Sequence, residues 1–355
     1  MNRGIEALLR NPLGFLGVGG EGGEIVLSTR IRYARNLAGR SFPGALTAEE
    51  RRSVCREVEA AAAAAGEPDA AGSMLIFDLG ALASEDLEVL AERRLVDPGV
   101  LHSPENARLL MRADESRSVV VNAADHLRLQ AVRGGFRPEE CLRDLNELDD
   151  AFAAHLDYAF DDKLGYLTAS PAEVGTGMRA SVMLHLPALF LSGEVPATIQ
   201  GIGKLHLAIR GAFGDGPENR GNLFILSNQC TLGESESEIL ERLSSVVRRL
   251  EDQEKLARAA LLRKDRESVL DFVGRSYGIL RHSHCLGGAE AVKCLSGVRL
   301  GVDLGLFSAV DRRRVDELLL AVGSAHLRKR ADAPLSAAVA AIRRAALCRE
   351  AFKNL

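Results

Sequence analysis

The sequence predicts an α+β fold in which a part that mixes strands and helices is followed by a helical C-terminal domain. Up to about residue 233, short strand-like apolar runs alternate with helical patterns. From Glu234 onward, apolar residues recur at alternating spacings of four and three, at Ile239, Leu243, Val246 and Leu250. This spacing predicts one long helix that continues towards Leu280. Residues 289–306 and 311–355 show further amphipathic helical patterns, so the C-terminal part is expected to be all helical.

The composition is that of an ordinary soluble globular protein. Of the 355 residues, 46% are hydrophobic and 26% are charged, and the formal net charge is -4. This balance gives no global reason to expect binding to nucleic acid or to a membrane. No apolar run reaches the roughly 18 residues that span a bilayer. Glu6, Arg10 and Pro12 interrupt the apolar residues that a signal peptide would need, so the expected compartment is the cytoplasm.

The cysteines are scattered and form no C-x-x-C pair, at Cys55, Cys141, Cys230, Cys285, Cys294 and Cys348. This pattern indicates neither a zinc framework nor a disulfide scaffold, so the thiols are expected to be reduced. His282, His284 and Cys285 could supply metal ligands. The simpler interpretation is a loop with unrelated polar residues, and no metal site is predicted.

The N-terminal region, residues 1–23, is predicted to be a flexible lead-in. Gly17, Gly19 and Gly22 formally match G-x-G-x-x-G, the fingerprint of a dinucleotide-binding turn. The match is weak because the run precedes the strand-like residues 24–27, whereas the fingerprint follows a strand and opens a helix.

The first strong strand signal is the run from Ile25 to Leu37. Arg30 and Arg32 are two residues apart in it, and this spacing puts both guanidinium groups on one face of an extended chain. An edge strand with a solvated basic face would explain the same pattern. The residues Thr47-Ala-Glu-Glu50 then form a capping box, which predicts a helix running to about Gly66.

A second strand begins at Val119 and carries polar residues at alternating positions up to Gln130, with Arg128 among them. A helix is predicted from about Pro138 to Phe160. The stretch from Gly165 to Leu189 follows, with a loop half that contains Pro171 and two glycines and an apolar half that contains Arg179 and His185.

The next feature is Arg210, which stands before a glycine-rich loop, residues 211–221. A strand is predicted after this loop at Asn222–Ser227. Loops of this length and composition are often lids over a site, although surface connections are commoner.

Arginines thus stand at separate points along the chain, at Arg30, Arg32, Arg128, Arg179 and Arg210. Several arginines at one site would suit a nucleoside triphosphate, because the guanidinium fork matches phosphate oxygens and keeps its charge. No G-x-x-x-x-G-K-[ST] segment offers another phosphate site. The spacing alone does not bring the five arginines together.

The segments around these arginines resemble the successive motifs of the ATP:guanidino phosphotransferases, the phosphagen kinase superfamily. The similar segments are Ser28–Asn36, Asn122–Arg128, Gly175–Ser181, Arg210–Gly211 and Ser227–Gly233. Within this family the chain is most similar to the McsB-type protein-arginine kinases of bacteria, through Gly165–Thr168, Arg179–Leu189 and Val298–Gly305. The similarity runs in order from about residue 24 to the C-terminus.

The resemblance implies an antiparallel sheet flanked by helices in a catalytic domain at residues 24–255, and a helical domain at residues 256–355. It implies that the five arginines hold the phosphates of ATP and that Mg²⁺ bridges those phosphates. The nucleotide-binding positions that it implies are Ser28, Thr29, Arg30, Ile31, Arg32, Arg128, Arg179, Ala180, Ser181, Val182, Met183, Arg210, Gly211, Ala212, Phe213, Gly214 and Asp215.

The resemblance also implies partners. Relatives that act on small guanidino metabolites carry a helical domain before the first arginine motif, whereas only 27 residues precede Ser28 here. A more open site is therefore expected, one that admits an arginine on a protein substrate. An activator protein and proteolytic or stress-response machinery are expected from the family. Self-association into a homo-oligomer is expected through the C-terminal helices.

The catalytic positions depart from the family pattern. Ala124 stands where the family has a catalytic glutamate, and Asp215 stands where it has a second glutamate. Ser170 replaces the family cysteine, and Glu173 lies in the same altered loop. The candidates for catalysis are therefore Asp215, Asp125, Glu173 and Ser170.

Loss of a general base slows a reaction by typically 10²–10⁴-fold. Three interpretations stay open: a slow protein-arginine kinase, a nucleotide-binding pseudokinase with a regulatory or scaffolding role, and a kinase of a small guanidino metabolite. The phosphoarginine-sensing motif Arg-Asp-x-x-Arg-Ala is also altered, because Ala340 and Ala341 replace its first two residues while Arg344 and Ala345 remain. Self-regulation by phosphoarginine is therefore not expected.

Overall fold

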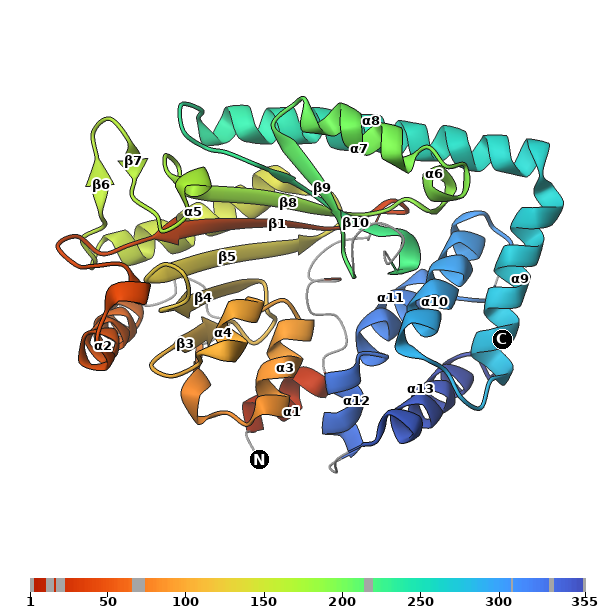
Figure 1. The fold of residues 1–355 in the computed structure, drawn as a ribbon, viewed down its shortest axis with the longest axis horizontal. Coiled ribbons are helices and arrows are strands. Elements are labelled where there is room, and N and C mark those ends of the chain that lie inside the picture. The colour runs from red at the N-terminus through yellow and green to blue at the C-terminus, as the bar shows by residue number, and fades with distance from the viewer. Residues whose placement is uncertain are drawn as a thin grey trace.

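The computed structural model describes residues 3–10, 16, 23–65, 74–213, 220–307, 309–331 and 335–353. Among these residues, the main element is an eight-stranded sheet in the order β2-β3-β4-β5-β1-β8-β10-β9, with every neighbouring pair antiparallel (Figure 1). Its strands are β1 Val26–Arg35, β2 Leu75–Asp78, β3 Arg108–Met111, β4 Arg117–Val121, β5 Leu127–Gly134, β8 Met178–His185, β9 Leu207–Gly211 and β10 Leu223–Asn228. A separate hairpin pairs β6, Phe160–Asp161, with β7, Gly165–Tyr166.

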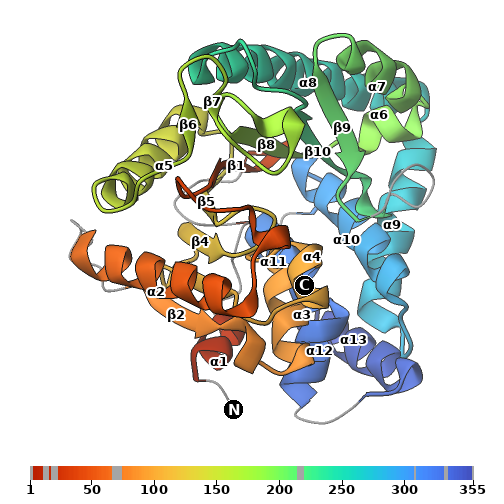
Figure 2. The same ribbon diagram turned by 60° about the vertical axis from the view of Figure 1, so that its left-hand side comes forward.

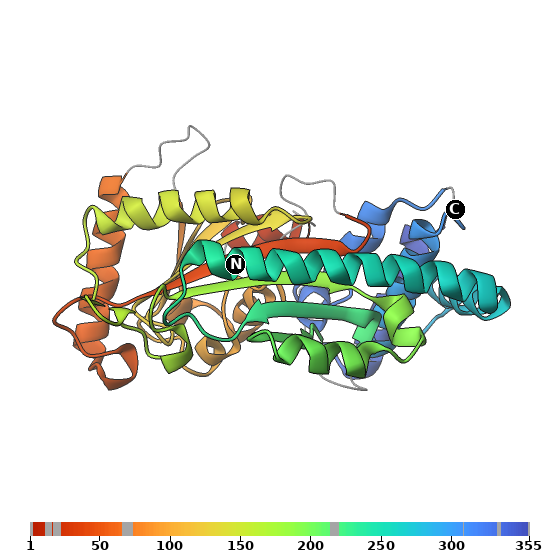
Figure 3. The same ribbon diagram turned by 90° about the horizontal axis from the view of Figure 1, so that it is seen from above.

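One face of the sheet packs against long helices. These are α2 (Ala48–Ala65), α5 (Pro138–Ala153) and α8 (Glu236–Lys264), and α8 extends along the sheet in Figure 3. Their apolar residues form the largest core with the inward-facing strand residues, and Ile31 of β1 is fully buried at its centre. The predicted capping box begins α2, where the backbone N–H of Thr47 donates to Glu50 at 2.7 Å.

The other face of the sheet looks towards the C-terminal helices and two short helices of the N-terminal half (Figure 2). The C-terminal helices are α9 Arg266–His282, α10 Gly288–Asp303, α11 Arg312–Ala321, α12 Ser324–Ala331 and α13 Ala337–Ala351. The short helices are α3, Ser84–Glu92, and α4, Pro98–His102, and α12 packs beside α3. Two further helices, α6 Pro187–Leu191 and α7 Val195–Gly203, join β8 to β9.

The structure corrects three predictions about helices. Part of the lead-in expected to be flexible forms α1, Arg3–Arg10, because Ile5 and Leu8 share one face and are buried; residues 11–15 and 17–22 lie outside the described residues. The helix expected to reach Phe160 ends at Ala153. The long helix breaks at Asp265, which leaves helical geometry and caps α9 by accepting a hydrogen bond from the Ser268 N–H at 3.3 Å.

The domain boundary expected between residues 255 and 256 falls inside the continuous helix α8 and stays a prediction. The six cysteines are free thiols. Within the described part of the chain, none of the helices is long and apolar enough to cross a membrane.

Candidate nucleotide and phosphotransfer site

The sheet register brings all five arginines to one face, which we call the arginine face. Arg32 on β1 lies opposite Arg179 on β8, and Arg30 lies opposite Ser181. Arg128 belongs to the same row of alternating residues on β5 as Gln130, which lies opposite Arg32. Arg210 on β9 lies opposite Ile225, which in turn lies opposite Met183 on β8. The five side chains thus project from four strands towards α3, α4 and the C-terminal helices.

Four residues predicted to bind the nucleotide have side chains on the opposite, helix-covered face: Thr29, Ile31, Ala180 and Val182. All four side chains are fully buried there, and the Thr29 hydroxyl donates to the Gly135 carbonyl at 2.8 Å. Successive side chains in a strand point to opposite faces, so residues that alternate with the arginines must point into the core. These four positions are therefore excluded from side-chain contact with a ligand on the arginine face.

The remaining described positions of the predicted set border the arginine face. Ser28, Ser181 and Met183 surround a small recess beside Arg30. Gly211 ends β9, and Ala212 and Phe213 line a larger cavity. Gly214 and Asp215 lie outside the described residues, so the structure does not report on the candidate carboxylate at Asp215.

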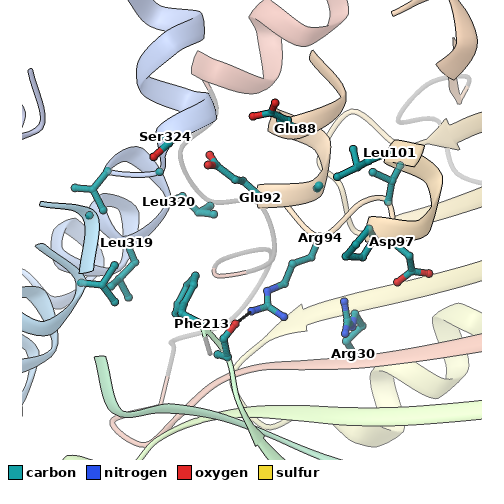
Figure 4. A pocket seen from close by; sticks show the side chains of 18 of the residues that line it. Arg30, Glu88, Glu92, Arg94, Asp97, Leu101, Phe213, Leu319, Leu320 and Ser324 are labelled. Atoms are coloured by element: carbon teal, nitrogen blue, oxygen red, sulfur yellow. Dashed lines mark hydrogen bonds between the residues drawn. The ribbon is translucent and has the colours of Figure 1, made fainter. Parts of the chain in front are cut away.

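A cavity of about 590 Å³ lies at the end of the arginine face that holds Arg30 and Arg32 (Figure 4). Arg30 lies on one side and Leu319 and Leu320 of α11 on the other, with Phe213 between them, and Arg32 also lines the cavity. Its volume falls in the range of small-molecule sites, which are roughly 300–1,000 Å³. A cavity with cationic side chains at one end and apolar ones at the other suits a ligand that has an anionic chain and an apolar ring.

Sequence reasoning missed Arg94, which also points into this cavity. It follows α3 in the left-handed backbone region, at φ 60°, and its guanidinium donates to the Ala212 carbonyl at 3.0 Å and lies 5.8 Å from the centre of the Phe213 ring. The only sequence signal is the Arg93-Arg94 pair before Asp97-Pro98. Arg94 comes from a part of the chain without a periodic pattern, and packing of α3 against α12 brings it to the site.

The cationic groups on this face lie close enough to repel one another. Burial, together with the neighbouring charges of Arg32 and Arg94, holds the pKa of Arg30 well below its usual value. Burial and the charge of Arg32 lower the pKa of Arg94 to about 10. Arg30 reaches the hydroxyl of Ser181 at only 3.5 Å. A partly buried cluster of like charges is stabilised when it binds an anion, and a chain of phosphates supplies several charges at the required spacing.

Two carboxylates already contact three of the arginines. Asp97 pairs with Arg32 at 3.0 Å and with Arg128. Glu173 lies 3.6 Å from Arg128 and 3.6 Å from Arg179. Glu173 is therefore placed at the arginine face, as a candidate catalytic residue should be, but its carboxylate faces two guanidinium groups.

Asp125, another candidate, is fully buried and ties three segments together. Its Oδ1 accepts hydrogen bonds from the Asn36 side chain at 2.8 Å and from the Ala169 N–H at 2.7 Å. Its Oδ2 lies 3.7 Å from Arg128 and has no hydrogen-bond partner among the described residues. The structure thus gives Asp125 a positioning role for the loop that carries Ser170. Ala124, at the position of the family glutamate, is exposed in the turn between β4 and β5.

The described residues include no group of three or more His, Cys, Asp or Glu side chains placed to hold a metal ion. Mg²⁺ keeps several waters and is commonly bound through substrate phosphates with one or two carboxylates, so it does not require such a group. The arginine face and its two nearby carboxylates fit an ion that is carried by phosphates.

Comparison with known proteins identifies the family. Residues 54–257 match the family model described as ATP:guanido phosphotransferase, C-terminal catalytic domain, and residues 266–355 match that of the protein-arginine kinase McsB C-terminal domain. A protein-arginine kinase of Shouchella clausii is 38% identical over 98% of this chain and 98% of its own length. Another, from a Geobacillus strain, is 41% identical over 94% of this chain and 92% of its own length. The chain belongs to the protein-arginine kinase family.

Membership confirms the fold that the resemblance implied, because a phosphagen kinase has the same architecture. The crystal structure of a lombricine kinase superposes with a TM-score of 0.57 at 25% identity, over 69% of this chain and 70% of that one. The family is one of enzymes that use ATP as the phosphoryl donor.

The C-terminal segment aligned with the phosphoarginine sensor lies on α13. Its remaining arginine, Arg344, is buried and donates to the backbone carbonyls of Val322 at 2.8 Å and Leu286 at 2.9 Å. These bonds give Arg344 a structural role that joins three C-terminal segments. The expected loss of phosphoarginine sensing stays a prediction.

Proposed function

We propose that this protein transfers the γ-phosphoryl group of ATP to arginine side chains of protein substrates. The observation that carries the proposal is the arginine face, where Arg30, Arg32, Arg128 and Arg179 project from neighbouring strands beside a cavity of nucleotide size. In the proposed reaction a guanidino nitrogen of the substrate attacks the γ-phosphorus. An N–P bond forms, the P–O bond to ADP breaks, and the guanidinium loses a proton.

The residues of the arginine face fit this chemistry. Phosphoryl transfer proceeds through a loose transition state whose charge lies on the equatorial oxygens, and fixed guanidinium groups stabilise that charge. Mg²⁺ would neutralise further charge on the phosphates. The end of the face nearest Arg128 is the end for the guanidino substrate, because Asp125 and Glu173 lie beside Arg128 there.

Among the described residues, the proposed site lacks a well-placed carboxylate to accept the proton of the substrate guanidinium. Ala124 carries no carboxylate, and Asp125 already accepts two hydrogen bonds through one oxygen. Glu173 and Asp215 are the proposed acceptors, and Ser170 lies in the same loop as Glu173. A base that is misplaced by about 1 Å can cost 10²-fold in rate, so we expect the transfer to be slow.

A second candidate function is that of a nucleotide-binding pseudokinase with a regulatory or scaffolding role. Two observations favour it: alanine at position 124, and the commitment of the buried carboxylate of Asp125 to loop positioning. The phosphate-binding arginines are retained in both candidates. The candidates therefore agree on nucleotide binding and differ only in turnover.

One assay separates the candidates. The protein is incubated with ATP, Mg²⁺ and an unfolded protein substrate, and acid-labile phosphate on arginine is detected by mass spectrometry under non-acidic conditions. Arg179→Ala serves as the control without phosphate binding. Phosphoarginine formed by the wild type alone supports the kinase, whereas ATP binding without product supports the pseudokinase. Phosphorylation of free arginine in place of protein would indicate a kinase of small metabolites.

The partners remain part of the proposal. The family name implies a protein substrate that presents arginine. An activator protein, a link to proteolytic or stress-response machinery, self-association through the C-terminal helices and a cytoplasmic location remain predictions from the resemblance and from the composition.

A further inference from the structure

The carboxylate of Asp97 lies within the proposed phosphate site. Asp97 precedes α4, and its carboxylate bridges Arg32 of β1 and Arg128 of β5 through their Nη1 atoms. These two nitrogens belong to the set of donors that phosphate oxygens would use. Asp97 therefore occupies the site in the way that an anionic ligand would.

The charge environment makes Asp97 a permanent anion. Burial by itself would raise the pKa of this carboxyl group, but Arg32 and Arg128 overcome that effect and lower its pKa to about 2. A group with so low a pKa is a poor proton acceptor near neutral pH, because an efficient general base has a pKa near the working pH. The carboxylate therefore acts at the site as a fixed negative charge.

We propose that Asp97 is an internal competitor of the nucleotide, which holds Arg32 and Arg128 in the empty site and must leave them when the terminal phosphate binds. This inference rests on the nucleotide site proposed above. Like charges placed side by side in a site cost several kcal/mol, so the carboxylate and a phosphate cannot share these two guanidinium groups without loss of affinity.

The geometry allows Asp97 to leave. Its side chain is 37% exposed and lines the cavity, so rotation about its side-chain bonds takes the carboxylate into solvent. The backbone before it is fixed, because Glu92 at the end of α3 accepts hydrogen bonds from the N–H groups of Ala325 at 2.8 Å and His326 at 3.1 Å on α12. Displacement of the side chain, and not of the helix, is the expected response.

The competition should depend on the length of the phosphate chain. Arg128 lies at the end of the face where Asp125 and Glu173 are found, which is the proposed end for the guanidino substrate and hence for the γ-phosphoryl group that it attacks. ATP reaches Arg128 and must displace Asp97, whereas AMP does not extend that far. Asp97 therefore selects against the triphosphate relative to the monophosphate.

Calorimetric binding of ATP and AMP to the full chain tests this inference. For Asp97→Asn and Asp97→Ala, the Kd for ATP should fall by at least about tenfold, the lower end of the coupling measured for close charge pairs, while the Kd for AMP stays unchanged. In thermal melts, both variants should be less stable than the wild type without nucleotide. They should match the wild type at saturating ATP, because the contact is absent from the complex.

Asp144→Asn is the matched control. Asp144 also bridges two arginines of neighbouring strands, Arg117 at 2.9 Å and Arg133 at 2.5 Å, but it lies on α5 at the helix-covered face. Its replacement should lower stability equally with and without ATP and leave both Kd values unchanged.

Unchanged or weaker ATP binding by both Asp97 variants would overturn the inference, since Asp97 would then support the arginines in the complex. An equal gain for ATP and AMP would also overturn it. If neither the wild type nor any variant binds ATP, the nucleotide site itself is wrong and the inference fails with it. If the wild type binds ATP and the Asp97 variants bind it with the same Kd, the nucleotide site stands and only the role of Asp97 as a competitor is rejected.

Discussion

Arg32 and Arg179 lie directly opposite each other on the adjacent strands β1 and β8. Like charges in this position destabilise a sheet, so the pairing lowers the stability of the fold unless an anion lies between the two groups. Glu173 and Asp97 provide part of that negative charge in the absence of a ligand. The proposed binding of a polyanion would therefore relieve a repulsion that lowers the stability of the protein without ligand.

Replacement of Arg30 should reveal this cost. The pKa of Arg30 is lowered by burial and by the charges of three neighbouring guanidinium groups, those of Arg32, Arg94 and Arg179. Arg30→Met keeps much of the side-chain volume and removes the charge, so the free energy of unfolding without nucleotide should rise by about 1 kcal/mol. ATP should no longer stabilise the variant. Urea denaturation with and without ATP measures both effects, and Arg56→Met on the exposed surface of α2 should change neither.

Restoring a carboxylate at position 124 should increase turnover. Ala124 is exposed in the turn next to the end of the site that holds Asp125, so a glutamate fits there without a clash. Ala124→Glu should raise the rate of arginine phosphorylation by about 10²-fold, as expected for a recovered general base, with little change in ATP affinity.

Ala123→Glu is the control for this gain, because Ala123 is the neighbouring residue but is partly buried against the core around α3. Equal rates for Ala124→Glu and the wild type in the phosphoarginine assay would mean that position 124 does not limit the reaction.

Asp125 should prove important for stability as well as for the site. Asp125→Ala leaves the buried Asn36 amide and the Ala169 N–H without their shared acceptor, and an unsatisfied buried group costs about 1–3 kcal/mol. The unfolding free energy should fall by about 2–4 kcal/mol. Asp114→Ala is the matched control, because Asp114 also accepts two hydrogen bonds, from the N–H and hydroxyl of Ser116, but its side chain is 45% exposed. A similar loss for both variants in urea denaturation would contradict the positioning role.

The sequence predicted the parts of the site that repeat with strand geometry. The spacing of Arg30 and Arg32 was enough to place both on one face, and the resemblance to the family brought in Arg128, Arg179 and Arg210 from other strands. The same alternation turns the side chains of Thr29, Ile31, Ala180 and Val182 to the opposite face of the sheet. Along a strand, only every second side chain can face a ligand on the arginine face.

The rest of the site depends on packing that has no local signal. Arg94 and Asp97 reach the arginine face because α3 is held against α12, more than 200 residues later in the chain, through Glu92 and His326. The sequence near residues 93–98 has no periodic pattern that predicts the contact between α3 and α12. The break between α8 and α9 was missed for a related reason, since the apolar pattern continues past Asp265 and only the capping geometry stops the helix.

The stability of the protein should depend on pH through His126. Burial lowers the pKa of His126 to about 4, and its Nδ1 accepts a hydrogen bond from the Leu37 N–H at 3.0 Å, which requires the neutral ring. Between pH 4 and 6.5 the unfolded chain binds a proton that the folded chain does not, so the unfolding free energy should rise with pH by about 3 kcal/mol over this range. His126→Gln should flatten the rise. His102→Gln, on the exposed end of α4, should leave the rise of the unfolding free energy with pH unchanged. If both variants show a rise of equal size, the rise comes from groups other than His126.

Replacement of Gly177, which directly precedes β8, should distort the start of that strand. It has φ 68°, and an added Cβ would lie 2.6 Å from the Ala34 carbonyl oxygen and 2.6 Å from Nη1 of Arg35. Arg35 cannot give way easily, because it pairs with Asp149 at 2.7 Å and lies 3.6 Å from the centre of the Tyr166 ring. Gly177→Ala should therefore displace the backbone that leads to Arg179, two residues later.

Gly39→Ala isolates the steric part of this effect, because Gly39 has nearly the same backbone conformation, φ 69°, with nothing within 4 Å of the added Cβ. We expect Gly39→Ala to lower the unfolding free energy by about 1 kcal/mol, the cost of the left-handed conformation for an L-residue. Gly177→Ala should cost at least about 3 kcal/mol and weaken ATP binding through Arg179, since backbone atoms must move. Equal losses in thermal melts would show that the conformation alone, and not the contact with Ala34 and Arg35, makes glycine necessary at this position.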